Sequence, residues 1–449
     1  MDERHRRLLI KQNPQWKGDP IRTYEFKRDK FHVLKKDMDH PQIIAIVGLR
    51  RTGKTVLIKQ IMQELQGSVP DNNIGYISFD DRDFQRYETA GELIDYFLTF
   101  SKKDEKRFLF LDEIQKVPNW PDLLKTFYDV EEDLKMIISG SSSLELEDSR
   151  ETLAGRILTH MIPVLSFREF VRYFHQESSI EVGSFSREYD LKFLPNKEIY
   201  ISLLEDYVRR GAFPELLEQS DRSFITRYIK ESVIEKVISD ISRRIKPRRE
   251  DIVNDLLIIF SRNTARLFEI VNIANALGIN RNTASEYINM LQKTFLIKVD
   301  RNFTKSALKR ARTSKKAYIA HSCIPIAMLE HQEGTIDGSD MGHLIETVIA
   351  NNLTDTGFWR SPRKEEVDIV LSGPIPVEIK YRDHIGKKDL AGLERFMDRF
   401  DVETGIVVTR DQLDLNGSGD RRILRIPVWL FLLIDEKDLA DLSKIKGSS

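Results

Sequence analysis

The sequence predicts an α/β protein of several domains, and three observations support this fold class. The chain has 449 residues, whereas one hydrophobic core usually holds roughly 150, so more than one domain is expected. Apolar runs alternate with helical patterns from residue 42 to about residue 165, as in a parallel sheet flanked by helices. A second α/β pattern begins near residue 342, after a mostly helical region.

The first domain is expected to cover residues 1–166. Its four apolar runs are continuous rather than alternating, which is typical of parallel strands buried on both faces. The layout is that of an α/β nucleotide-binding domain. The predicted strands are Ile43–Val47, Ile74–Phe79, Phe108–Leu111 and Met136–Ser139.

The second domain is expected to cover residues 167–245 as a helical lid. Apolar residues recur at helical spacing in Ile199–Arg210 and Ser223–Ile241, and a Gly- and Pro-containing loop separates the two stretches. Residues 243–249 are mostly basic and contain a proline, so they are expected to form a linker.

Residues 246–305 are expected to form a winged helix-turn-helix. One helix is predicted at Ile270–Leu277, and Gly278 permits the tight turn that follows. Asn280 can cap a second helix that runs to about residue 292. A wing is expected to begin at Phe295–Val299.

The last domain, residues 306–449, is predicted to be a second α/β domain. Its pattern gives a helix from about Gly342, a strand pair around Gly373 and Pro374, and a last apolar strand. A helix at Leu390–Phe400 and a strand at Gly405–Thr409 lie between the pair and that last strand.

Composition excludes several classes of protein. Hydrophobic residues make up 41% of the chain and charged residues 31%, which excludes global disorder. The 70 Lys and Arg residues balance the 71 Asp and Glu residues, so any basic surface must be local. Cys323 is the single cysteine, which excludes an intrachain disulfide framework and favours a reducing, cytoplasmic setting.

No membrane partner is expected. Residues 1–11 are strongly charged and lack the apolar core of a signal peptide. The longest apolar run, Val428–Ile434, is much shorter than the roughly 20 residues that span a bilayer. We expect this run to form a buried strand or a helical turn.

A phosphate-binding loop follows the first predicted strand. Residues Gly48–Thr55 satisfy G-x-x-x-x-G-K-[ST], and an amphipathic helix, Val56–Leu65, follows them. The glycines let the backbone wrap around phosphate oxygens, and the helix N terminus favours an anion. Lys54 is expected to bridge the β and γ phosphates and Thr55 to bind Mg²⁺. The residues predicted to bind ATP here are Gly48, Arg50, Arg51, Thr52, Gly53, Lys54, Thr55 and Val56.

The third predicted strand ends in two carboxylates, as in a Walker B motif. Asp112 is predicted to hold Mg²⁺, directly or through water, and Glu113 to orient and deprotonate the attacking water. Alone, an Asp-Glu pair at a strand end is ordinary surface chemistry. Together with the phosphate-binding loop, it predicts ATP hydrolysis.

Two further residues are candidates for the ATP site. Ser139 ends the fourth strand and could sense the γ phosphate, although a Ser- and Gly-rich turn explains it equally well. Arg156 is a candidate arginine finger that acts within the chain or on a neighbour, which would require a homo-oligomer. A lone arginine is more often solvated or structural.

With these motifs the sequence resembles the archaeal and bacterial AAA-type ATPases that carry a nuclease-like C-terminal domain, the DUF4143-like architecture. The resemblance implies an AAA ATPase core, a winged helix and a terminal domain related to restriction endonucleases. One departure is His321, near which relatives usually carry an aspartate; its role is left open. The resemblance rests on Ile46–Thr55, Leu111–Lys116, Ser139–Ser142, Leu153–Arg156 and Pro163–Phe170.

Four polar residues of the last domain follow the PD-(D/E)XK nuclease pattern, namely Glu346, Asp368, Glu378 and Lys380. The period of two puts Glu378 and Lys380 on one strand face, which can also receive Asp368. Asp368 and Glu378 are predicted to hold one or two Mg²⁺ ions, and Lys380 to position the nucleophilic water. The motif is short, so the alternative is a nuclease-like fold without turnover.

Residues 301–316 form a basic strip that contains no acidic residue. Cations that neutralise phosphates give salt-sensitive binding without sequence preference, so the strip predicts contact with nucleic acid, and DNA is favoured. Arg281, Asn282 and Ser285 are candidates for base contacts. The alternative is that these cations are merely solvated. The cations of the strip are Arg301, Lys305, Lys309, Arg310, Arg312, Lys315 and Lys316.

The sequence therefore predicts an ATP- and Mg²⁺-dependent enzyme that acts on nucleic acid and carries a metal-dependent nuclease domain. An alternative from another class is an ATPase switch or scaffold whose terminal domain is catalytically silent. A third possibility is an enzyme that remodels DNA without cutting it.

Overall fold

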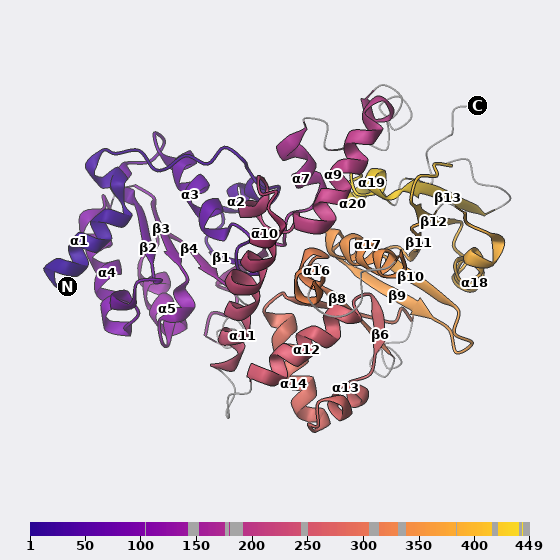
Figure 1. Cartoon of the computed structure of the whole chain (residues 1–449). Coiled ribbons are helices and arrows are strands. Elements are labelled where there is room, and N and C mark those ends of the chain that lie inside the picture. Colours follow the sequence, from indigo (N-terminus) through magenta and orange to yellow (C-terminus); the bar gives the residue numbers. More distant parts are fainter. Residues whose placement is uncertain are drawn as a thin grey trace. The chain divides into compact units, whose positions relative to one another are not determined.

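The computed structural model forms two compact units, which Figure 1 follows along the chain. The first unit contains Met1–Val164 and Lys293–Phe295, and the second contains Leu165–Gln292 and Leu296–Ser449. The structure describes residues 1–103, 105–141, 152–175, 179, 192–243, 250–304, 314–330, 338–382, 384–414, 421–439 and 442.

The first unit is built on a five-stranded parallel sheet in the order β2-β3-β4-β1-β5. All four predicted strands are present. The sequence did not predict β5, an edge strand whose side chains are only partly buried. Because the strands are parallel, their carboxyl ends meet at one edge of the sheet. The strands are β1 (Ile43–Val47), β2 (Ile74–Ser78), β3 (Arg107–Asp112), β4 (Leu134–Gly140) and β5 (Ile157–Met161).

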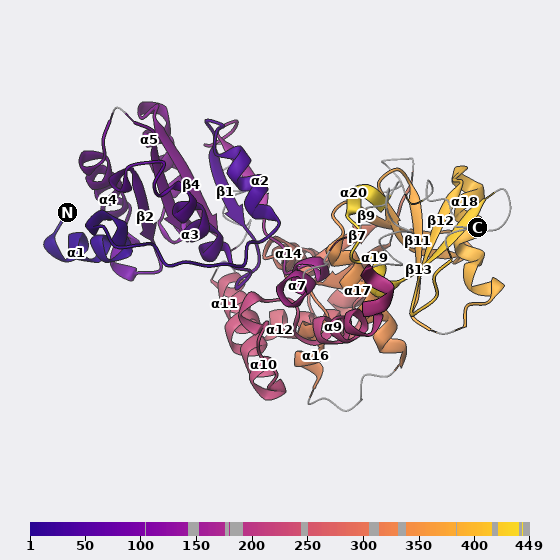
Figure 2. The ribbon, with the colours of Figure 1, turned by 90° about the horizontal axis from the view of Figure 1, so that it is seen from above.

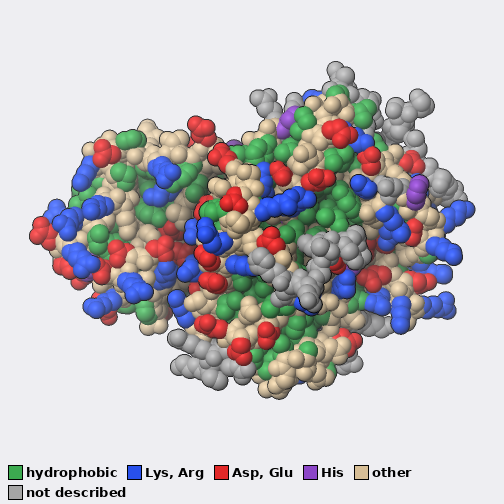
Figure 3. All heavy atoms as spheres, viewed as in Figure 1, with side chains coloured by type: hydrophobic (Ala, Val, Ile, Leu, Met, Phe, Trp, Pro, Cys, Tyr) green, Lys and Arg blue, Asp and Glu red, His purple; other side chains and the backbone are tan. Residues whose placement is uncertain are grey.

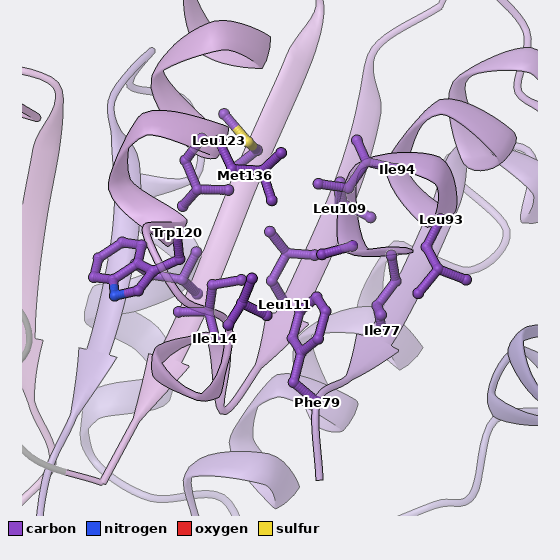
Figure 4. Close-up of a cluster of buried hydrophobic side chains, with 14 of the residues drawn as sticks. Ile77, Phe79, Leu93, Ile94, Leu109, Leu111, Ile114, Trp120, Leu123 and Met136 are labelled. Atoms are coloured by element: carbon purple, nitrogen blue, oxygen red, sulfur yellow. The ribbon is translucent and has the colours of Figure 1, made fainter. Parts of the chain in front are cut away.

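Helices cover both faces of this sheet, and alternate strand residues point to opposite layers. On β1, Ile43 and Ala45 join one buried cluster, and Ile44 and Ile46 join the other. Figure 4 shows the first cluster, in which Trp120 and other apolar side chains pack against the strands. The helices of the first layer are α1 (Glu3–Gln12), α4 (Tyr87–Phe100) and α5 (Trp120–Val130), and those of the second are α2 (Lys30–Asp37) and α3 (Lys54–Leu65).

The N-terminal segment covers the edge strand β2 with side-chain amides. Asn13 Nδ2 donates to the Tyr76 carbonyl at 2.8 Å, and Asn13 Oδ1 accepts from the Tyr76 N–H at 2.7 Å. Gln12 Oε1 accepts from the Ser78 N–H at 2.8 Å, and Gln15 Nε2 donates to the Ile74 carbonyl at 2.8 Å. These amides take the place of a neighbouring strand, so the exposed edge of β2 is satisfied.

The second unit begins with helices, as predicted for the lid. Ser166 caps α7 in a capping box with Glu169, which explains why the helix starts there. A π-helical turn, Ile229–Ile234, joins α10 to α11. Most of the predicted linker, residues 244–249, lies outside the described residues. The helices are α7 (Phe167–Phe174), α9 (Lys197–Arg210), α10 (Arg222–Tyr228), α11 (Glu235–Ser242), α12 (Glu250–Arg262) and α16 (Cys323–Leu329).

A three-stranded antiparallel sheet in the order β6-β8-β7 accompanies two short helices. Gly278 has φ +63°, which permits the turn between the helices, and Asn280 Oδ1 accepts from the Thr283 N–H at 2.9 Å as a helix cap. Strand β8 lies beyond residue 305, the expected end of this domain. The elements are β6 (Arg266–Phe268), α13 (Ile270–Ala276), α14 (Arg281–Lys293), β7 (Ile297–Arg301) and β8 (Lys315–Ile319).

The last part of the chain forms a five-stranded mixed sheet in the order β13-β12-β11-β10-β9. The predicted hairpin is β10 and β11, and β11, β12 and β13 are parallel. Figure 2 shows α18 beside this sheet, where its apolar face packs. The elements are α17 (Gly338–Asn352), β9 (Thr356–Arg360), β10 (Glu366–Leu371), β11 (Ile375–Lys380), α18 (Ala391–Phe400), β12 (Thr404–Thr409), β13 (Arg422–Pro427), α19 (Val428–Phe431) and α20 (Glu436–Leu439).

The apolar run Val428–Ile434 forms a buried helical turn, one of its two predicted forms, and the last strand precedes it. Trp429 is fully buried and stacks on Tyr200 with ring centroids 5.3 Å apart. Within the described ranges, none of the helices has the length and apolar character needed to cross a bilayer. Figure 3 shows positive and negative side chains interspersed on the viewed face, in agreement with the net charge of −1.

Candidate functional site

The phosphate-binding loop joins the buried strand β1 to helix α3, at the carboxyl edge of the first sheet. Gly53 has φ +89°, a conformation that glycine adopts without strain. A Cβ on Gly48 would lie 2.2 Å from the backbone oxygen of Ile162, so no larger residue fits there. Both motif glycines are therefore required by the backbone path.

The Lys54 ammonium lies inside this loop. It donates to the carbonyls of Gly48 at 2.9 Å and Leu49 at 3.0 Å, and the residue is only 6% exposed. The Thr52 hydroxyl donates to the same Leu49 carbonyl at 2.9 Å. The loop thus holds a positive charge at the position where the motif predicts phosphate oxygens.

A buried hydrogen-bond network surrounds the Asp112 carboxylate. The Thr55 hydroxyl donates to Asp112 Oδ2 at 2.8 Å, and the Tyr76 hydroxyl donates to the same oxygen at 2.9 Å. The Ser139 hydroxyl donates to Asp112 Oδ1 and accepts from the Glu113 N–H at 3.1 Å. The structure therefore brings together the four residues predicted at this edge, Thr55, Asp112, Glu113 and Ser139.

Tyr76 is the member of this network that the sequence did not reveal. It lies inside the apolar run of β2, where an aromatic residue is expected to be part of the core. Burial and the adjacent Asp112 carboxylate raise the pKa of the Tyr76 hydroxyl far above its ordinary value. Tyr76 therefore remains a proton donor that holds Asp112 in place.

Thr55 and Asp112 form a donor set that fits Mg²⁺. A hydroxyl and a carboxylate converge at the carboxyl edge of the sheet, and oxygen atoms are the ligands that this hard cation prefers. Thr55 would bind the ion and Asp112 would hold it directly or through water. Lys54 stands in the same loop for the phosphates.

Glu113 stands at a strained position beside this network. Its φ is +56°, which is uncommon for a residue with a side chain. Glu113 Oε2 accepts from the Gln115 side-chain amide at 2.6 Å, so the carboxylate is oriented. Gln115 was not predicted as a site residue, and its position two residues later in the Asp-Glu-Ile-Gln motif is the only sequence signal.

Arg28 supports the loop from a distant part of the chain. Its guanidinium donates to the Thr52 carbonyl at 2.8 Å and to the Pro163 carbonyl at 3.0 Å, and the residue is 5% exposed. These bonds tie the phosphate-binding loop to the segment after β5. A lone arginine in the N-terminal segment carries no motif, so the sequence alone does not reveal this role.

The remaining predicted ATP-site residues take different positions. Arg50 and Arg51 lie on the loop, Arg51 with φ +68°, and Val56 lies in the first turn of α3. Arg156 is not part of the nucleotide site of its own chain, which corrects the predicted role within the chain. Its carbonyl accepts from the N–H of Ile43, the first residue of β1, so it lies at the opposite end of the sheet.

Arg156 has a structural partner at that end. Its side chain donates to Asp129 Oδ1 at 2.9 Å, and the guanidinium lies 5.9 Å from the centre of the Tyr128 ring. Because β1 is five residues long and rises about 3.3 Å per residue, this end is remote from the phosphate-binding loop. A structural role, the alternative considered from the sequence, accounts for the position of Arg156.

The four residues predicted for a nuclease site come together in the second unit. Glu378 and Lys380 lie on β11, where the Lys380 ammonium is hydrogen-bonded to Glu378 Oε1. Asp368, on β10, accepts from the Ile379 N–H at 2.9 Å. Glu346 projects from α17 and is 5% exposed.

A lysine that the sequence placed elsewhere lies among these carboxylates. The Lys316 ammonium is 2.7 Å from Glu346 Oε1, 3.1 Å from Glu366 Oε1 and 3.7 Å from Asp368 Oδ1. Its side chain is 2% exposed. The prediction that Lys316 belongs to a phosphate-binding strip is therefore wrong, because on β8 it points away from solvent. We call Lys316, Glu346, Glu366, Asp368 and Glu378 the acidic centre.

Burial dominates the electrostatics of the acidic centre. It raises the pKa of Glu346 to about 8, and the Asp368 carboxylate adds to this shift. Burial followed by Asp368 also raises the pKa of Glu378 to about 8. Burial opposes the charged form of Lys316, but Glu346 and the other carboxylates raise its pKa well above the ordinary value.

As these side chains stand, they do not fit a metal ion. In the part of the chain that the structure describes, no three Asp, Glu, His or Cys side chains converge as metal ligands. Glu378 Oε2 is buried and has no hydrogen-bond partner within the described ranges. The carboxylates predicted to hold Mg²⁺ are instead arranged around an ammonium group.

His321, whose role the sequence left open, is part of the core. Burial lowers its pKa to about 3, so the ring is neutral at physiological pH. Its Nδ1 accepts from the Cys323 N–H at 3.2 Å, and the ring packs edge-on against Tyr207 with centroids 4.7 Å apart.

Of the predicted nucleic-acid contacts, Arg281, Asn282, Ser285 and Arg301 are exposed. Lys315 is partly buried, and burial together with the nearby charges of Arg301 and Arg281 lowers its pKa. The other cations of the strip, Lys305, Lys309, Arg310 and Arg312, lie outside the described residues.

Comparisons with known proteins find relatives over much of the chain and two domains of unknown function. An uncharacterized protein of Methanocaldococcus jannaschii is 28% identical over 437 residues, which cover 91% of this chain and 90% of that protein. An uncharacterized protein of Haemophilus influenzae is 26% identical over 335 residues, which cover 72% of this chain and 76% of that protein. Residues 201–334 and 341–430 match two domains of unknown function, DUF8612 and DUF4143.

The N-terminal part of the chain matches a domain model that has a name. A solved Walker-type ATPase of Pyrococcus abyssi is similar with a TM-score of 0.41 and 15% identity, over 68% of this chain and 96% of that chain. Residues 40–171, which contain the phosphate-binding loop and Asp112, match the model of the AAA domain. This match supports a P-loop nucleotide-binding domain of the AAA type in the N-terminal part of the chain.

Proposed function

We propose that the protein is a Mg²⁺-dependent ATPase that acts on nucleic acid. The observation that carries this proposal is the convergence of Lys54, Thr55 and Asp112 at the carboxyl edge of one parallel sheet. Lys54 binds the β and γ phosphates, and Thr55 and Asp112 hold Mg²⁺, which neutralises phosphate charge when bound.

Two of the remaining residues orient the attacking water, and two others hold Asp112. Glu113 lies next to Asp112 and accepts a proton from the water as the water oxygen bonds to the γ phosphorus and the bond from that phosphorus to the bridging oxygen breaks, which releases ADP. The Gln115 amide holds one oxygen of the Glu113 carboxylate and leaves the other for the water. Tyr76 and Ser139 hold the two oxygens of Asp112, so that Asp112 keeps one orientation.

A steady-state assay of phosphate release tests the ATPase proposal. Wild-type protein is expected to hydrolyse ATP only with Mg²⁺, and Glu113→Gln is expected to bind ATP normally but to lose turnover. Equal turnover by wild type and Glu113→Gln would show that Glu113 is not the catalytic base. Failure of wild type to bind ATP and Mg²⁺ would contradict the proposal as a whole.

We propose that the region from β6 to β8 contacts nucleic acid as a winged helix. The order β6-α13-α14-β7-β8 after α12 is the order of elements in that motif, which supports the proposal. Burial lowers the pKa of Lys315, and the charges of Arg301, at the end of β7, and Arg281, at the start of α14, lower it further. Clustered cations of this kind favour a polyanion, and DNA remains the favoured partner.

Metal-dependent cleavage by the last domain is the further part of this proposal. Glu346, Asp368, Glu378 and Lys380 lie in one part of the second unit, which supports it. A silent terminal domain within an ATPase switch or scaffold is the second candidate, and the Lys316 ammonium among the carboxylates favours it. Incubation of labelled DNA and RNA with wild type, Asp368→Ala and Lys380→Ala, with and without ATP and Mg²⁺, separates the two.

A further inference from the structure

We infer that the acidic centre is a divalent-cation site that Lys316 holds closed, so that a metal ion binds only when this ammonium is removed or withdrawn. The inference concerns the carboxylates of the proposed nuclease site, and it rests on that proposal for their location but not for cleavage. It explains why four carboxylates gather without forming a metal site.

Three carboxylates surround the Lys316 ammonium. Lys316 Nζ is within 3.1 Å of Glu346 and Glu366 and 3.7 Å from Asp368, so three carboxylates face one ammonium group. An ammonium group has three donors and no acceptor, and it can serve these oxygens in the way that a small cation would. The three carboxylates come from α17 and β10, and Lys316 reaches them from β8.

The charges of the acidic centre lead to the same conclusion. Metal binding requires ionised carboxylates, a state that Glu346 and Glu378 reach as pH rises through about 8, and in that state Glu346, Glu366, Asp368 and Glu378 contribute four negative charges. Arg360 Nη1 lies 3.7 Å from Glu366 Oε2. Lys316, Lys380 and Arg360 contribute three positive charges, so the formal sum is −4 + 3 = −1. Without the Lys316 charge the sum becomes −2, which one divalent cation neutralises. The Lys316 charge and a divalent cation are therefore alternatives at this site.

One carboxylate oxygen of the acidic centre is unsatisfied. Among the residues that the structure describes, nothing donates a hydrogen bond to the buried Glu378 Oε2, although the other oxygen of the same carboxylate binds Lys380. A buried carboxylate oxygen that lacks a donor costs free energy. Glu378 interacts with Asp368 and with Lys316 electrostatically, so its charge is directed into the same centre. A cation between Asp368 and Glu378 would satisfy this oxygen.

The position of Lys316 on β8 explains how its ammonium could be withdrawn from the carboxylates. Lys315 and Lys316 are neighbours, and successive strand residues face opposite sides. Lys315 is influenced by Arg281 and Arg301, whereas Lys316 lies within the carboxylates. One short strand thus joins the proposed nucleic-acid surface to the acidic centre.

Direct Mn²⁺ binding tests the inference without nucleotide or nucleic acid. Isothermal titration of Mn²⁺ into full-length wild type, Lys316→Met and Lys316→Arg is expected to show about tenfold or greater tightening only for Lys316→Met. The double variant Lys316→Met/Asp368→Asn should lose this gain. Any binding at Asp112 is common to all four proteins and cancels in the comparison.

Two results would overturn the inference. One is equal Mn²⁺ affinity in wild type and Lys316→Met, and the other is Mn²⁺ binding by wild type that Asp368→Asn removes. If Lys316→Met does not fold, Lys316→Gln keeps a hydrogen-bond donor without the charge, and the wild-type and Asp368→Asn pair still decides the question. Absence of DNA cleavage by every protein would count against the nuclease proposal alone.

Discussion

The nucleotide site and the acidic centre both contain buried carboxylates beside a lysine, but the two lysines act on different atoms. At the nucleotide site, Lys54 donates to loop carbonyls, and Asp112 is held by hydroxyl groups. In the acidic centre, Lys316 donates to the carboxylates themselves. The hydroxyl donors leave the charge of Asp112 for a metal ion to neutralise, whereas the Lys316 ammonium already faces Glu346 as its counter-charge. The neighbours of a motif residue therefore determine its chemistry.

Removal of the lysine charge at the nucleotide site should have the largest effect. Lys54→Ala is expected to lower kcat/KM for ATP by about 100-fold or more, because the phosphates lose their point charge in a shielded loop. Lys125→Ala, an exposed lysine on α5, is the matched control and should leave the activity unchanged. Turnover by Lys54→Ala near the wild-type rate would contradict the assignment of the site.

Removal of the corresponding charge in the acidic centre should instead reduce stability. Lys316→Met is expected to lower the free energy of unfolding by about 3 kcal/mol, because uncompensated carboxylates remain buried. The double variant Lys316→Met/Glu346→Gln should recover part of this loss. Chemical denaturation measures both values, and additive losses in the double variant would show that the pair is not coupled.

The pH dependence of stability should distinguish the acidic centre from the rest of the protein. The pKa of Glu378 is raised to about 8, so its contribution is present below the unfolded value near 4.5 and is lost as pH rises through about 8. Glu378→Gln should therefore remove a loss of stability on the order of 4 kcal/mol between pH 5 and pH 9. Thermal melts at several pH values measure this loss in wild type, Glu378→Gln and the exposed control Glu88→Gln. The same pH dependence in wild type and Glu378→Gln would contradict the prediction.

The Asp112 network predicts a smaller change at the nucleotide site. Tyr76→Phe removes one donor to Asp112 but keeps the ring in the core. We expect the Mg²⁺ concentration for half-maximal ATPase activity to rise about tenfold, with little change in the free energy of unfolding. A loss of stability without a change in the Mg²⁺ requirement would make Tyr76 a structural residue only.

Removal of single cations from the proposed winged helix should have the smallest effect. Arg281→Ala and Arg301→Ala should each reduce the salt dependence of DNA binding by about one unit of the slope of log K against log salt. Fluorescence anisotropy at several salt concentrations measures this slope. A slope that neither variant changes would place the DNA contact elsewhere.

Much of the first unit could be predicted because its signals are local. Four buried strands, the loop at Gly48–Thr55 and the carboxylates after β3 each depend on residues adjacent in sequence. The helices around Gly278 could also be predicted, since a cap at Asn280 and a positive φ are local properties. The edge strand β5 could not, because its pattern of partly buried residues resembles a loop.

The sequence by itself determined which groups could bind phosphate, because a Gly-rich loop between a strand and a helix needs no distant partner. Only the tertiary structure decided that Tyr76 and Arg28 support this site, that Arg156 lies at the other end of the sheet, and that Lys316 belongs to the carboxylates rather than to a basic surface. Whether a charge binds a ligand or neutralises a buried neighbour depends on residues that are close in space but far apart in sequence, and chain folding alone brings them together.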